Sequence, residues 1–142
     1  MFTLELAWFE LDLPDQAQVK AEVAAPSPLF SNMRVGTVWR IGLGRFEMTA
    51  ALDAVRGLHD LSREAFDAGN RATEFDAGGL PGLRVGGYDR DDSRTDWWFS
   101  LNGLTLALTL RATSAGAIVP TEAECRDHAA IIRSVRRVER ND

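Results

Sequence analysis

The alternation of apolar and polar residues is most regular around the pair Asn102-Gly103. After this pair, leucines occupy every second position from 104 to 110, and threonine, alanine and arginine occupy the alternate positions from 105 to 111. A period of two is typical of a strand that buries one face. Asn-Gly tolerates positive φ at both central turn positions, so it predicts a two-residue hairpin turn. We therefore expect a hairpin within residues 96–113, with one face covered by other elements.

Shorter strands are predicted by the same alternation elsewhere in the chain. Between Phe2 and Leu13 the alternation changes phase near Trp8, which predicts a bulge or a break between two short strands. Residues 18–23 alternate again, and we expect them to pair back on the first strand. Further strands are expected at 35–41, 46–48, 72–76 and 83–88.

Residues 50–68 change to a helical period. Thr49 is a candidate N-cap, and Gly69-Asn70 can supply a left-handed stop after the helix. The spacing of three and four residues predicts an amphipathic helix. Its expected buried stripe consists of Leu52, Val55, Leu58, His59, Ser62, Ala65 and Phe66.

A second helix is predicted after Pro120. Thr121 and Glu124 form a capping box, in which each side chain satisfies a backbone donor of the other residue. Arginines follow at 133, 136, 137 and 140, where the helix dipole favours cations. The expected buried stripe consists of Cys125, His128, Ile131, Ile132, Val135 and Val138.

Together these elements predict a single α+β domain over residues 1–142, with a mostly antiparallel sheet flanked by two main helices in an α/β/α sandwich-like arrangement. A chain of 142 residues with 45% hydrophobic content can bury enough apolar surface to fold as one domain. We expect the hairpin leucines to lie under the last helix.

Charge and hydropathy narrow the classes of partner. The chain has 16 basic and 21 acidic residues, and the basic ones are scattered, so we expect no nucleic acid partner. The N-terminal residues lack the basic and apolar regions of a signal peptide, and no apolar run approaches 18 residues. We therefore expect a cytoplasmic protein without membrane insertion.

Cys125 and His128 are the strongest candidates for a catalytic pair or a shared metal, because they lie three apart on one face of the predicted last helix. Cys125 is the only cysteine, so an intramolecular disulfide is excluded. Both residues also lie on the stripe assigned to the core, where cysteine behaves as a small hydrophobe. We expect them to be structural, with no catalytic residues, no cofactor and no metal.

The segment 89–96 concentrates acidic residues at Asp89, Asp91, Asp92 and Asp96. A calcium loop would need a central glycine, which Arg94 replaces here, and a later glutamate, which is missing. We expect a solvated hairpin tip, with an acidic patch for a basic partner as the second interpretation.

Trp97 and Trp98 are adjacent in a predicted strand, so they point to opposite faces of the sheet. If helices cover both faces, both side chains belong to the core. If only one face is covered, one tryptophan is exposed and can anchor a partner. The possible partner contacts are therefore Trp97, Trp98, Asp89, Asp91 and Asp92.

Three segments together resemble the PsbP-like superfamily: AGGLPGLRV at 77–85, WWFSLNGLTLALTLRAT at 97–113 and AAIIRSVRRV at 129–138. This superfamily includes photosystem extrinsic proteins, a Ran-binding nuclear import factor, bacterial DcrB proteins and small secretion-associated chaperones. The resemblance covers roughly residues 35–138 and implies an antiparallel sheet sandwiched by helices, used mainly for protein partners. It identifies no subfamily, so no binding residue is carried over.

The resemblance implies a non-catalytic, cytoplasmic protein-binding module that acts as an adaptor or chaperone for a secreted effector. An immunity protein that neutralises a toxin is an alternative that binds the same kind of partner. A small-molecule binder would use a cavity between the sheet and the helix from Leu52 to Phe66. An enzyme would use Cys125 and His128. A homodimer through a free strand edge is also compatible with the pattern.

Overall fold

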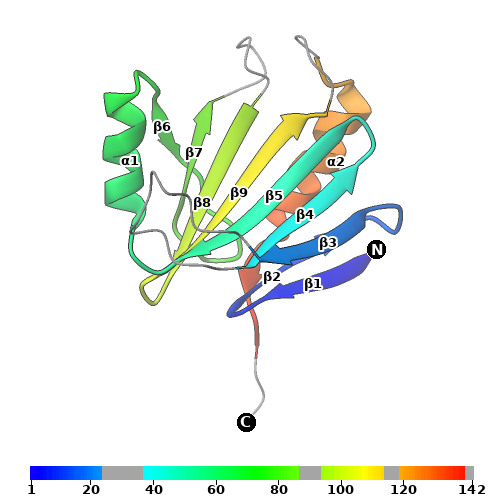
Figure 1. The fold of residues 1–142 in the computed structure, drawn as a ribbon, viewed down its shortest axis with the longest axis horizontal. Helices are drawn as coiled ribbons and strands as arrows, with labels where there is room; N and C mark the ends of the chain where they lie inside the picture. Colours follow the sequence, from blue (N-terminus) through cyan, green and yellow to red (C-terminus); the bar gives the residue numbers. More distant parts are fainter. Residues whose placement is uncertain (24–36, 87–93, 114–118, 140–142) are drawn as a thin grey trace.

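A seven-stranded antiparallel sheet forms the centre of the molecule (Figure 1). The computed structural model describes residues 1–23, 37–86, 94–113 and 119–139. The central hairpin lies in the middle of this sheet, as β8 and β9. Across the sheet the strands follow the order β3 (Gln18–Val23), β4 (Thr37–Leu43), β5 (Phe46–Asp53), β9 (Leu104–Ala112), β8 (Arg94–Leu101), β7 (Gly82–Gly86) and β6 (Ala72–Glu74).

The two faces of this sheet are covered differently. A three-stranded sheet of β1 (Phe2–Leu6), β2 (Phe9–Leu13) and β10 (Arg136–Arg137) shares one face with helix α2 (Glu122–Arg133). Helix α1 (Leu58–Asp67) packs on the opposite face, against β6, β7 and β8. The fold is therefore α+β with mostly antiparallel sheets, as the sequence predicts. The sequence indicates one sheet, however, and the structure has a second, three-stranded one.

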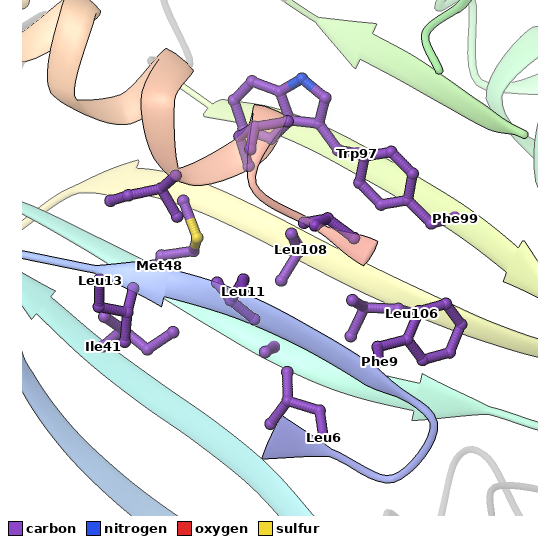
Figure 2. Packing of buried hydrophobic residues seen from close by; sticks show 14 of the residues in the cluster. Leu6, Phe9, Leu11, Leu13, Ile41, Met48, Trp97, Phe99, Leu106 and Leu108 are labelled. Carbon is purple, nitrogen blue, oxygen red and sulfur yellow. The ribbon is translucent and has the colours of Figure 1, made fainter. Parts of the chain in front are cut away.

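The main core lies between the large sheet, the small sheet and α2. Figure 2 shows Phe9 and Leu11 of β2 among the leucines of β9. Leu106 and Leu108 are fully buried, so the period of two marks a covered face as predicted. Burial of this apolar surface is the main term that favours folding. The cover over the hairpin comes from β2 as well as from α2, whose Ile131 and Ile132 are also in this core.

The hairpin turn is confirmed. Asn102 and Gly103 both have positive φ, 50° and 80°, and β8 pairs with β9 from Leu101–Leu104 outward. These angles are those of the type I′ turn, whose twist matches that of the flanking strands.

The predicted helix over residues 50–68 is wrong in its first half. Residues 46–53 form β5, and α1 begins only at Leu58, with Gly57 instead of Thr49 as its N-cap. Of the expected buried stripe, Ala65 is buried as predicted, but Val55, His59 and Phe66 are exposed. Leu61 and Ala65 are the buried residues of α1, whereas Phe66 is 79% exposed.

Pairing on both sides explains why this segment is a strand. β5 pairs with β4 along one edge and with β9 along the other. Its alternate residues Phe46, Met48 and Ala50 are fully buried in the main core. The alanines and leucine that follow Met48 also fit a helix, but tertiary pairing overrides that weak local preference. The predicted stop at Gly69-Asn70 is confirmed, since Gly69 has φ 80° and the Asn70 N–H donates to the Ala65 carbonyl.

The N-terminal strands pair differently from the prediction. The break near Trp8 is confirmed, because β1 and β2 form a hairpin around Ala7-Trp8. However, residues 18–23 pair with β4 in the large sheet and not with the first strand. The remaining strands lie close to their predicted places, as β4, β6 and β7.

Helix α2 confirms the capping box. The Thr121 side chain accepts the Glu124 N–H at 3.1 Å, and the Glu124 carboxylate accepts the Thr121 N–H at 3.0 Å. The helix ends at Arg133, earlier than the predicted stripe. Arg136 and Arg137 form β10 and pair with β2, so they do not load a helix terminus.

Candidate functional site

A pocket of about 250 Å³ opens between α1 and the strands β7 and β8. Helix α1 forms one wall of the pocket and the outer face of the sheet forms the other. We call it the Trp98 pocket. Its lining residues are Leu61, Glu64, Ala65, Asn70, Val85, Gly86, Arg94, Asp96 and Trp98.

The alternation of β8 decides which side chains enter the pocket. Trp97 is 5% exposed and belongs to the main core, whereas Trp98 is half-buried and lines the pocket on the other face. The prediction that the two tryptophans point to opposite faces is confirmed. Of the two, Trp98 is the one that a binding partner can reach.

Asp96 is a nearly buried carboxylate on the wall of the pocket, and sequence reasoning treated it only as part of an acidic loop. The Thr109 hydroxyl donates to Oδ1 of Asp96 at 2.6 Å, and Nε of Arg94 lies 3.1 Å from Oδ2. Asp96 and Thr109 are directly opposed in the β8–β9 register. The signal was available, since Asp96 and Trp98 share a face in any strand that contains both.

The rim of the pocket on α1 is held by a second set of charges. Arg56 Nη1 donates to Glu64 at 2.8 Å, and its Nε donates to Asp53 at 2.7 Å. The other Asp53 oxygen accepts the N–H groups of Val55 and Arg56. Burial alone would raise the pKa of Asp53, but these hydrogen bonds hold it below the usual value. The ionised carboxylate thus fixes the turn that leads into α1.

His128 and Cys125 lie on the core side of α2, away from the Trp98 pocket. His128 is 4% exposed, and its ring meets the edge of Phe46 with centroids 4.9 Å apart. Burial lowers the pKa of His128 below its ordinary value, although the charges of Glu124 and Asp127 oppose that shift. Cys125 is partly buried one turn earlier. The stripe predicted for α2 is confirmed at His128, Ile131, Ile132 and Val135.

The three aspartates predicted as partner contacts are not among the residues that the structure describes. Asp89, Asp91 and Asp92 lie outside the described residues, so the predicted acidic patch stays a prediction. Among the residues that the structure describes, no three His, Cys, Asp or Glu side chains are grouped closely enough to hold a metal ion.

Comparison with known proteins gives no relative. The chain matches no family model, no curated protein and no solved structure. Neither of the described helices has the length and apolar character needed to cross a membrane.

Proposed function

We propose that this chain is a non-catalytic protein-binding module that receives a side chain of its partner in the Trp98 pocket. The observation that carries the proposal is the pocket itself. It combines the half-buried indole of Trp98 with the nearly buried carboxylate of Asp96. An aromatic wall beside a few fixed polar groups is typical of the places where a partner residue is anchored.

The size of the pocket favours a protein partner over a free ligand. Pockets that enclose drug-sized ligands usually measure about 300–1,000 Å³, and this one measures about 250 Å³. A single partner side chain fits such a volume, while the rest of the partner can lie on α1 and the neighbouring strands.

The polar groups of the pocket are held before any partner arrives. Asp96 is bonded by Thr109 and Arg94, and Glu64 is bonded by Arg56. Groups that are already oriented lose little freedom on binding, which favours affinity. This arrangement suits recognition, because hydrogen bonds within the chain fix the positions of both carboxylates.

The resemblance to the PsbP-like superfamily supports the same class of function. It favours a cytoplasmic adaptor or chaperone for a secreted effector, with a toxin-neutralising immunity protein as the alternative. Both bind another protein without chemistry, so the Trp98 pocket serves either role.

Charge reversal at the pocket rim tests the proposal. The partner is first isolated from native lysate with the tagged wild-type chain, and its affinity is measured by calorimetry. Glu64→Arg should weaken binding at least tenfold, because it places a bulky cation on the rim and breaks the pair with Arg56. Asp67→Arg is the matched control, since Asp67 is an exposed residue of the same helix that does not line the pocket. Equal effects of the two variants, with both folded by circular dichroism, would place the binding surface elsewhere.

A small-molecule binder is the second candidate, and the concave shape of the Trp98 pocket is the observation that favours it. Native mass spectrometry of the gently purified chain distinguishes the two candidates. A protein-binding module should show only the mass of the chain or of its dimer, whereas a ligand binder should carry an additional mass that Glu64→Arg reduces.

Catalysis through Cys125 is the third candidate, and its reactivity tests it. Iodoacetamide should modify the native thiol at pH 7 at least tenfold more slowly than the urea-unfolded thiol, because Cys125 is partly buried on α2. Native modification at or above the unfolded rate would revive the catalytic interpretation.

A further inference from the structure

The free edge of the large sheet is the strand β3, which has six residues and pairs with β4 on one side only among the described strands. An edge strand presents backbone N–H and C=O groups that can pair with another chain. The opposite edge, β6, has three residues and packs beside α1. β3 is thus the longest edge strand in the part of the chain that the structure describes.

The two faces of β3 differ in character. Val19 lies opposite Ile41 of β4 and so shares the core face, yet it is 36% exposed because no described strand lies beyond it. Ala21 lies on the same face of the strand. Lys20 and Glu22 lie on the outer face, where the Lys20 side chain is 77% exposed.

We propose that two copies of this chain associate through β3, with the strands antiparallel and Ala21 opposite Ala21 of the second copy. This register places Lys20 opposite Glu22 of the second copy, and Glu22 opposite its Lys20. The two sheets then form one continuous sheet across a twofold axis.

The charges select this register over its neighbours. A shift of the pairing that keeps each face intact must move the facing residue by two. One such shift places Lys20 opposite Lys20 of the second copy, and the other places Glu22 opposite Glu22 of the second copy. Like charges directly across a strand pair are destabilising, whereas opposite charges are favourable. The sequence of β3 is therefore self-complementary in a single register.

The Lys20–Glu22 pairs between the copies would extend a row of ion pairs that already runs across β3, β4 and β5 within one copy. Glu22 accepts a hydrogen bond from Arg40 of β4 at 3.1 Å, and Arg40 also donates to Glu47 of β5 at 3.0 Å. The hydrogen bonds from Lys20 and Arg40 lower the pKa of Glu22, so it is ionised at neutral pH. Lys20 of the second copy would add to the same row.

The exposed apolar residues on this side of the molecule support the same contact. In Figure 1 the edge strand of the small sheet, β1, and the chain's first residue lie on the same side as β3. Phe2 of β1 is 38% exposed, and Val19 has a similar exposure. A second copy at β3 would remove part of this apolar surface from water.

Charge exchange tests the proposed dimer by sedimentation equilibrium. The wild-type chain should show a concentration-dependent mass that reaches twice that of the monomer. Lys20→Glu and Glu22→Lys should each raise the dimer dissociation constant at least tenfold, because each places like charges opposite one another. The double variant should return to within threefold of wild type, since both cross-copy pairs are restored. The proposal would be overturned by a wild-type chain that stays monomeric at about 0.5 mM, which is roughly the upper limit for relevant self-association. It would also be overturned by a double variant that associates as weakly as the single variants.

Disulfide crosslinking tests the register independently. In a Cys125→Ala background, Ala21→Cys should give an oxidised dimer, because directly opposed Cα atoms lie about 4.5–5.5 Å apart. Val19→Cys is the control, since Val19 of each copy is offset by four residues, or roughly 13 Å, from Val19 of the other. Crosslinking of Val19→Cys at the same rate, or failure of both variants to crosslink, would contradict this register. Because β3 does not line the Trp98 pocket, these outcomes are independent of the partner-binding test with Glu64→Arg.

Discussion

Arg136 and Asp12 lie 124 positions apart in the chain, and the guanidinium of Arg136 binds both carboxylate oxygens of Asp12. The two distances are 3.0 Å from Nη1 to Oδ2 and 3.1 Å from Nη2 to Oδ1. Nε of the same arginine donates to Glu10 at 2.8 Å. One side chain thus ties β10 to β2, where only two residue pairs of backbone register connect the strands.

Arg136→Lys should destabilise the fold although the charge is kept. An ammonium group cannot reproduce the planar fork that binds two carboxylates at once. We expect the free energy of unfolding to fall by about 1 kcal/mol. This is near the upper end for a partly exposed ion pair, because several charged hydrogen bonds are involved. Urea unfolding measures the change, and Arg137→Lys is the control, since Arg137 is exposed on the neighbouring position of β10. Equal stabilities of all three chains would show that the pairing contributes nothing.

The capping residue Glu124 should give the fold a dependence on acid. Hydrogen bonds from Arg45 and from the Thr121 N–H lower the pKa of Glu124 from 4.5 to about 2. Because the folded pKa is depressed, the stability it contributes is present above pH 4.5 and is lost as the pH falls toward about 2. Glu124→Gln keeps the capping geometry and removes the titration. Its urea midpoint should fall less between these pH values than that of wild type.

The control for this experiment is Glu122→Gln, which changes an exposed carboxylate in the same first turn of α2. It should leave the acid dependence close to that of wild type. If Glu124→Gln and wild type lose stability in parallel, then the pairing with Arg45 does not persist in solution.

Gly82 should resist substitution by alanine, because a Cβ there would collide with the backbone carbonyl oxygen of Phe75 and would lie 2.8 Å from Cδ1 of Phe99. Phe99 is a fully buried ring in the main core and cannot move away without disturbing its neighbours. We expect Gly82→Ala to cost about 1–3 kcal/mol of unfolding free energy, as overpacking usually does. Gly42→Ala is the control, since its Cβ would be at an ordinary 3.7 Å from Gln18. Thermal unfolding of both variants compares them, and equal melting temperatures would contradict the packing at Gly82.

The turn of the central hairpin should tolerate glycine at its first central residue but not alanine at its second. Gly103→Ala should destabilise the chain by about 1–2 kcal/mol, because an L-residue with positive φ is strained. Asn102→Gly places a residue that is free of this strain at the other position. Chemical denaturation should therefore separate the two variants, and a Gly103→Ala chain as stable as wild type would show that the turn has another form.

Local patterns predicted those elements whose structure depends on neighbouring residues. The Asn102-Gly103 turn and the Thr121–Glu124 capping box are short-range arrangements of backbone donors and acceptors. The opposite orientation of Trp97 and Trp98 follows from strand geometry alone. These features appear in the structure as the sequence indicates, including the face of Trp98 that lines the candidate pocket.

Features that depend on distant pairing could not be obtained in this way. Residues 46–53 are a strand because β4 and β9 pair with them on both sides, although the residues after Met48 fit a helix equally well. The Trp98 pocket needs α1 to lie against β8, and Asp96 needs Thr109 from the facing strand. Likewise, nothing near Arg136 in the sequence indicates that its partners are residues 10 and 12.

The place of β10 in the small sheet has a consequence for biosynthesis. On a ribosome, β1 and β2 emerge early, but β2 gains its second neighbour only when residues 136 and 137 have been added. Throughout that interval, β2 lacks backbone pairing along one of its two edges. A nascent chain stalled before residue 136 should therefore expose this hairpin to protease, whereas the released chain should protect it.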